Sequence, residues 1–210
     1  FQQEPPLSLD AEWPSHYFAD IWCEDWPRDS HITVVALDPS LGKTNKSDYS
    51  AFVAVTKGHD GNYYVDANIN RRDSRQIVED GIDWMRRIKP DAFGCEAIAF
   101  QDLLCDQFES RIHEAGLTVR DVWRINNGEG PGSGRTPPKI TRIRSLTQLL
   151  ATGRIRIRRS PGSSLLVEQL MGFPNHKHDD GPDALEMAIR LCEELLHGSG
   201  YEEPEEVLTT

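Results

Sequence analysis

The sequence predicts a single α/β domain in which helices flank a mixed central sheet. Three apolar runs rich in β-branched residues follow one another near the start, and helical periodicities then alternate with short apolar runs. The length of 210 residues fits one large domain better than two. Apolar residues make up 38% and charged residues 27%, which is enough of each for a packed core and a solvated surface.

The first part of the chain carries the clearest strand signals. Runs 32–38, 51–57 and 63–69 are apolar and predict a three-stranded meander. A polar loop at 39–50 separates the first two runs, and His59-Asp-Gly-Asn62 between the others predicts a tight turn. The chain therefore begins its fold with antiparallel pairing.

Helices and strands should alternate after this meander. A helix is expected to begin at Asp73 or Ser74, either of which can cap it, and to run to about Lys89. Pro90 then stops the helix, since proline cannot continue its hydrogen bonding. The later elements are expected to be a strand at 91–96, a helix at 100–115, a strand at 118–125, a Gly- and Pro-rich loop at 126–138, a basic helix at 139–152, a strand at 154–158 and helices at 163–173 and 182–196.

Charge is unevenly distributed along the chain. The net charge is −11, yet the segment from Arg135 to Arg159 holds eight positive charges and no acid. Such a segment either lies on a solvated face or contacts the phosphates of a nucleic acid. The candidate DNA-binding residues are Arg135, Lys139, Arg142, Arg144, Arg154 and Arg156.

Five acids are candidates for a metal site. Asp38 and Glu96 each end an apolar run, at the sheet edge where open α/β folds bind ligands. If their strands are neighbours, the two carboxylates repel unless a cation lies between them. Asp180 and Asp183 share one face of a helix start, with Asp179 just outside, although the helix dipole alone favours acids there. Carboxylates suit Mg²⁺ or Mn²⁺, and two such ions about 4 Å apart support phosphodiester cleavage.

Other kinds of site have less support. The four cysteines are scattered without a C-x-x-C pair, so neither a zinc site nor a disulfide framework is expected. No run approaches the roughly 18 apolar residues that a membrane span requires. Leu41-Gly-Lys-Thr44 imitates the end of a phosphate-binding loop, but Leu37 stands where that pattern needs glycine. An ATPase site is therefore not expected within these residues.

Three motifs are informative together. They are Leu37-Asp-Pro-Ser40 followed by Ser47-Asp-Tyr-Ser-Ala51, then Lys139-Ile-Thr-Arg-Ile143 with Leu146 and Gly153-Arg-Ile155, and finally Phe173-Pro174 with His178-Asp-Asp-Gly-Pro-Asp-Ala-Leu185. These motifs resemble the C-terminal nuclease domain of the large terminase subunit of tailed bacteriophages, which has an RNase H-like fold. The resemblance extends over about residues 30–197.

The resemblance implies a hydrolase that cuts double-stranded DNA concatemers during genome packaging, using two divalent metal ions. Asp38 would be the first ligand and Glu96 the second, where many relatives have Asp. The closing acids at 179, 180 and 183 would supply the third, with Asp183 as the catalytic member. Related resolvases open this helix with an Asp-x-x-Asp pair, as Asp180 and Asp183 do here. Asp48 either supports the metal ligands without binding the ion or merely begins the next strand.

Domain order and partners follow from the same resemblance. Residues 1–30 are expected to connect to a packaging ATPase domain in the full-length chain, 31–197 to form the nuclease domain and 198–210 to be an acidic tail. The expected partners are double-stranded DNA, the portal and the small terminase subunit, in the cytoplasm of the bacterial host and away from any membrane. The alternatives are an RNase H-like junction resolvase and a DNA- or portal-binding module with a decayed site.

Overall fold

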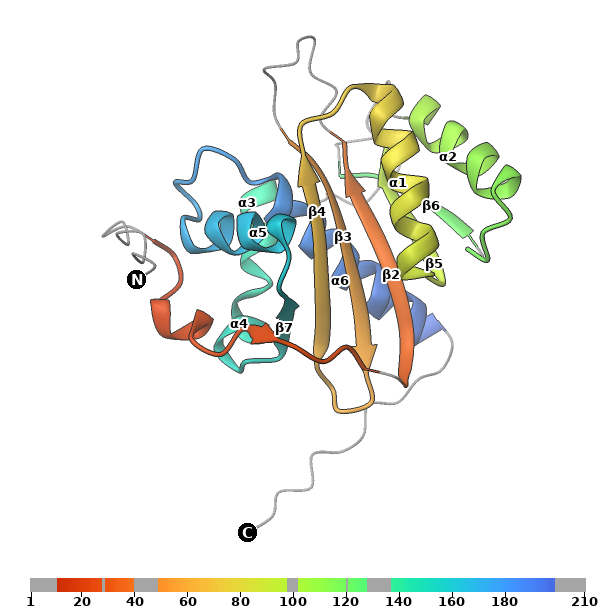
Figure 1. The fold of residues 1–210 in the computed structure, drawn as a ribbon. Coiled ribbons are helices and arrows are strands. Elements are labelled where there is room, and N and C mark those ends of the chain that lie inside the picture. The colour runs from red at the N-terminus through yellow and green to blue at the C-terminus, as the bar shows by residue number, and fades with distance from the viewer. Residues whose placement is uncertain are drawn as a thin grey trace.

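A seven-stranded mixed sheet forms the centre of the molecule in the computed structural model (Figure 1). The structure describes residues 11–27, 29–39, 49–97, 102–119, 121–127 and 137–198. Across the sheet the strands follow the order β1-β7-β4-β3-β2-β5-β6. They are β1 (Trp22–Cys23), β2 (Ser30–Asp38), β3 (Ser50–Gly58), β4 (Tyr63–Asn70), β5 (Ala92–Glu96), β6 (Asp121–Ile125) and β7 (Ile155–Arg158).

Helices cover both faces of the sheet. On one face α1 and α2 pack over a core cluster that includes Leu37, Phe52 and Phe108. On the other face α5 and α6 pack over a second cluster that includes Val53 and Leu185, and Figure 1 shows α6 passing behind the central strands. The helical elements are η1 (Ser15–Phe18), α1 (Ser74–Ile88), α2 (Asp102–Glu114), α3 (Lys139–Arg144), α4 (Thr147–Ala151), α5 (Pro161–Met171) and α6 (Asp180–Gly198).

The predicted meander is confirmed, and its register fixes one edge of the sheet. β2 pairs antiparallel with β3, where Asp38 lies opposite Ala51, and β3 pairs antiparallel with β4, where Ala51 lies opposite Ile69. β5 returns parallel to β2, and β6 is parallel to β5. The end of β2, the start of β3, the end of β4 and the end of β5 therefore lie at one edge.

Four of the five expected helices form, with shifted ends. Asp73 rather than Ser74 caps α1, because its carboxylate accepts a hydrogen bond from the Gln76 N–H while the Gln76 side chain accepts one from the Asp73 N–H. The last long helix, α6, begins at Asp180, two residues before the predicted start at Pro182. Asp180 and Asp183 therefore both belong to its first turn.

The prediction of one basic helix over 139–152 is wrong. The helix breaks at Ser145 and Leu146, whose N–H groups bond the carbonyls three residues back, at Arg142 and Ile143. Beyond the break, the Thr147 hydroxyl donates to the Arg144 carbonyl over 2.7 Å and accepts the Trp13 indole N–H over 2.9 Å. The Arg144 carbonyl thus accepts a hydrogen bond from a side chain, whereas in a continuous helix it would accept one from a backbone N–H. Two short helices form in place of one.

Residues 11–27 pack onto the domain. Trp13 is 2% exposed and stacks on Phe173, with ring centroids 5.0 Å apart. β1 pairs parallel with β7 and forms one margin of the sheet. The expected link from this segment to an ATPase domain stays a prediction.

Several sequence predictions lie outside the described residues. They concern Asp48, Arg135, positions 128–136 of the Gly-rich loop and the tail from 199 to 210. Within the described ranges, no helix combines the length and the apolar character that crossing a membrane demands.

Candidate active site

Asp38 and Glu96 each end a strand, as the sequence predicted, and the structure shows that these two strands are parallel neighbours. Leu37 of β2 lies opposite Cys95 of β5, so the next residue of each strand carries its carboxylate to the same edge. Adjacent strands are about 4.8 Å apart. Asp38 is 7% exposed and Glu96 is 8% exposed. Two nearly buried carboxylates therefore lie side by side.

The start of α6 brings further acids to this edge. Asp183 is 2% exposed, and Asp180 is also buried. The Gly181 N–H donates to Gln169 Oε1 over 2.8 Å and so anchors α6 to α5. A side chain at position 181 would stand only 2.7 Å from that oxygen, so glycine permits this close approach. The predicted acids at the strand end and at the helix start thus come together, since a single atom, the Lys139 Nζ, lies within 4 Å of carboxylate oxygens of Asp38, Asp179 and Asp183.

Two cationic side chains from α3 enter the acidic cluster. The Lys139 Nζ lies 2.9 Å from Asp179 Oδ1, 3.2 Å from Asp183 Oδ2 and 3.8 Å from Asp38 Oδ2. The Arg142 guanidinium is nearly buried, and its Nη2 donates to Asp183 Oδ1 over 2.8 Å. The sequence predicted that both residues bind DNA, which stays a prediction; in the structure both contact carboxylates of the cluster.

Burial dominates the electrostatics of the strand-end acids. It raises the pKa of Asp38 well above its usual range; the Lys139 charge partly opposes this, and Glu96, Asp183 and Asp180 add to it. Burial also raises the pKa of Glu96, against a hydrogen bond from Asn127 that lowers it. Burial would lower the pKa of Lys139, yet Asp38, Asp183 and Asp179 hold it above its ordinary value. The cluster thus favours bound positive charge.

The chemistry of this cluster fits a hard divalent cation. Its donors are carboxylate oxygens, which Mg²⁺ and Mn²⁺ prefer, and the Lys139 ammonium already stands among them as a cation. In the part of the chain that the structure describes, no three metal-binding side chains converge closely enough to hold an ion as they stand. The Lys139 ammonium contacts one carboxylate oxygen each of Asp38 and Asp183, and an ion shared by these two residues would bind the same oxygens.

A polar network behind the acids was not anticipated from the sequence. The Asn127 amide donates to Glu96 Oε1 over 3.0 Å, and its oxygen accepts from Arg190 over 2.9 Å. Arg190 also binds Glu186, whose second oxygen lies 3.5 Å from Arg142 Nε. Glu186 follows Asp183 by three residues and precedes Arg190 by four, a spacing that places all three on one helix face. This spacing is the feature of the sequence from which the polar network could have been predicted.

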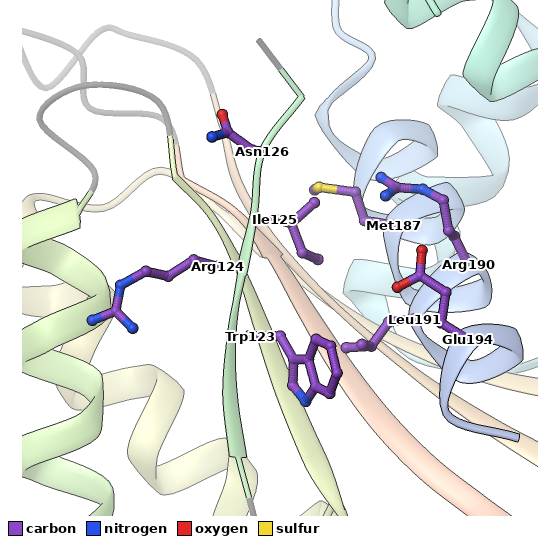
Figure 2. A pocket seen from close by; sticks show the side chains of 8 residues that line it. All are labelled: Trp123, Arg124, Ile125, Asn126, Met187, Arg190, Leu191 and Glu194. Carbon is purple, nitrogen blue, oxygen red and sulfur yellow. The ribbon is translucent and has the colours of Figure 1, made fainter. Parts of the chain in front are cut away.

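A small pocket lies beside this network, between β6 and α6 (Figure 2). Trp123 and Ile125 point from β6 toward α6, while Arg124 points to the opposite face. There Arg124 binds Asp106 and Glu109 of α2. Met187 and Arg190 line the α6 side of the pocket.

The structure divides the predicted DNA-binding residues. Arg144 forms two hydrogen bonds with Glu12, at 2.9 and 3.0 Å, and Arg156 donates to the backbone carbonyl of Asp20. Through the paired strands, Arg156 is level with Thr33, five residues before Asp38 on β2. That separation is about 17 Å along a strand. Arg154 precedes the same strand, β7, so the structure does not bring Arg154 and Arg156 to the acids.

Comparisons with known proteins identify the fold. The crystal structure of the HK97 bacteriophage large terminase matches with a TM-score of 0.55 and 13% identity, over 86% of this chain and 43% of the terminase chain. Thermus thermophilus RuvC (TM-score 0.46, 13% identity) matches over 80% of this chain and 98% of its own. A Fowlpox virus resolvase solved with Holliday junction DNA (0.46, 16%) matches over 79% of this chain and 99% of its own.

A scan against protein-family models and a search of curated proteins found no match. This chain spans less than half of the terminase chain that it resembles. At this level of identity the likeness establishes the fold. The chain has the RNase H-like architecture that its motifs predicted, a mixed sheet flanked by helices.

Proposed function

We propose that this chain is a divalent-metal-dependent endonuclease of the phage terminase type, which cuts double-stranded DNA concatemers during genome packaging. One observation carries the proposal: two strand ends and a helix start bring Asp38, Glu96 and Asp183 to the same edge of an RNase H-like sheet. Such a set of carboxylates is what hydrolysis of a phosphodiester by a bound cation requires.

Each side chain has a role in this account. Asp38 and Glu96 would hold the cation, which would activate water and stabilise charge on the phosphate. Arg142 fixes the Asp183 carboxylate in place through their 2.8 Å hydrogen bond. Asn127 orients Glu96 by donating a hydrogen bond to one of its carboxylate oxygens.

The partners follow from the same proposal. Double-stranded DNA is the substrate, and the packaging ATPase belongs to another domain of the full-length chain. The portal and the small terminase subunit would meet that assembly in the cytoplasm of the bacterial host. Arg135 remains a proposed DNA contact from the sequence, and Lys139 and Arg142 lie where a phosphate bound at the acids would meet them.

A substrate comparison tests the proposal. Supercoiled plasmid, linear duplex and a four-way junction are each incubated with the protein and Mg²⁺ or Mn²⁺, with EDTA as the control. We expect metal-dependent cleavage of plasmid and linear duplex without strong sequence preference. Cleavage confined to the four-way junction would replace the terminase assignment with a resolvase. DNA binding without cleavage under any metal would favour the decayed module.

A further inference from the structure

Lys139 has the surroundings of a bound cation. Its Nζ lies within 4 Å of Asp179, Asp183 and Asp38, with the shortest contact at 2.9 Å. A metal ion shared by Asp38 and Asp183 would have to occupy the same place between the end of β2 and the start of α6. Two cations in that space repel one another, because charges a few ångströms apart in a partly buried cluster are only weakly screened.

The position of Lys139 is built into the backbone. Pro137 and Pro138 precede it, and each proline ring fixes its own φ angle. The Arg142 N–H then bonds the Pro138 carbonyl over 3.1 Å and closes the first turn of α3. Lys139 and Arg142 are three residues apart, so they share a helix face, and both contact Asp183. The local structure thus directs two positive charges to one carboxylate.

The acids divide into two groups around this ammonium. Asp179 and Asp183 are the closer partners of Lys139, whereas Glu96 takes no part in its ion pairs and is held by Asn127 instead. Asp38 belongs to both groups, since it lies 3.8 Å from the ammonium and beside Glu96 on the adjacent strand. Asp38 and Glu96 thus offer a second pair of carboxylates, of which only Asp38 forms an ion pair with the ammonium.

We propose that Lys139 takes the place of one of the two metal ions expected for this fold, so that the loaded site holds a single divalent cation. Asp38 and Glu96 hold that cation, and the ammonium supplies the second positive charge next to Asp179 and Asp183. This inference rests on the proposed nuclease function and specifies the cofactor content of the same site. Lys139→Met removes the ammonium and opens the position for a second ion, whereas Lys139→Arg keeps the charge.

Manganese binding tests the inference without relying on cleavage. Calorimetric titration with Mn²⁺ gives the number of ions per chain, and electron paramagnetic resonance of frozen samples, with and without a short duplex, separates single ions from coupled pairs. We expect one uncoupled ion in the wild type and in Lys139→Arg, and a coupled pair in Lys139→Met. Lys177→Met is the matched control, because it removes an exposed lysine near α6 with the same change of charge.

The outcomes separate this inference from the proposed function. A coupled pair in the wild type, or a single ion in a folded Lys139→Met protein, overturns the role of Lys139 and leaves a metal nuclease standing. If Lys139→Met does not fold, the number of ions in the wild type alone decides the question. No manganese binding by any of the four proteins, with or without DNA, overturns both proposals.

Discussion

Arg142 donates a hydrogen bond from Nη2 to Asp183 Oδ1 over 2.8 Å, and both side chains are almost completely buried. The two residues come from different helices and are 41 positions apart in the chain. A buried ion pair of this kind costs desolvation on both sides, so each partner depends on the other for compensation. The pair ties α3 to the start of α6 and fixes the position of a site carboxylate.

We expect Arg142→Met to lower the free energy of unfolding by about 3–5 kcal/mol, because it leaves the Asp183 charge buried without its main partner. Arg144→Met, in the same short helix, breaks a more exposed pair with Glu12 and should cost about 1 kcal/mol or less. Chemical denaturation in EDTA measures both. Equal effects for the two variants would show that burial of the Asp183 pair carries no special weight.

The difference in stability between Asp38→Asn and the wild type should depend on pH. Burial raises the pKa of Asp38 in the folded protein, so the protonated carboxyl favours folding, and this contribution is lost as pH rises through the folded-state pKa. The amide stays neutral at every pH. In EDTA, the melting temperature of the variant should therefore exceed that of the wild type by more at about pH 8 than at about pH 4. A pH-independent difference would contradict the raised pKa.

Asn127→Ala should move metal binding to higher pH. The amide donates to the Glu96 carboxylate and lowers its pKa, so without it Glu96 stays protonated to a higher pH and competes less well for a cation. Manganese titrations across a pH series measure the shift. Asn126→Ala is the matched control, because Asn126 lines the neighbouring pocket instead of bonding Glu96. If the midpoint pH of manganese binding is the same in Asn127→Ala as in the wild type, Asn127 does not orient Glu96.

The salt dependence of DNA binding should distinguish the two halves of the basic segment. Each phosphate contact that is lost lowers the slope of log affinity against log salt by about 0.9. We expect that decrease for Arg135→Ala, which the sequence places in the loop before α3, and none for Arg156→Ala, whose side chain binds the Asp20 carbonyl far along the sheet from Asp38. If the slopes of both variants equal that of the wild type, neither residue contacts phosphate, and the basic segment lies on a solvated face.

The sequence predicted the parts of the site that follow from local patterns. Asp38 and Glu96 end apolar runs, and the acids from 179 to 183 stand at a helix start, so strand ends and helix ends located them before any contact was known. The sheet then brought these segments to one edge because β2 and β5 are parallel neighbours.

The remainder depends on contacts that sequence patterns do not encode. The break at Ser145 and Leu146 relies on Trp13, whose indole meets Thr147 from 134 residues away. The positive charges of Lys139 and Arg142 suggested DNA, since nothing local indicates that α3 faces the start of α6. Asn127 follows a strand like many loop residues, and only the approach of α6 gives its amide two partners.

Plasmid nicking by matched aspartate variants tests the central claim most directly. Supercoiled DNA is incubated with Mn²⁺ and either the wild type, Asp38→Asn or Asp121→Asn, the last being an exposed aspartate at the start of β6. The account predicts nicking by the wild type and by Asp121→Asn, with none above the EDTA background for a folded Asp38→Asn protein. Nicking by Asp38→Asn at the wild-type rate would contradict the assignment of the active site.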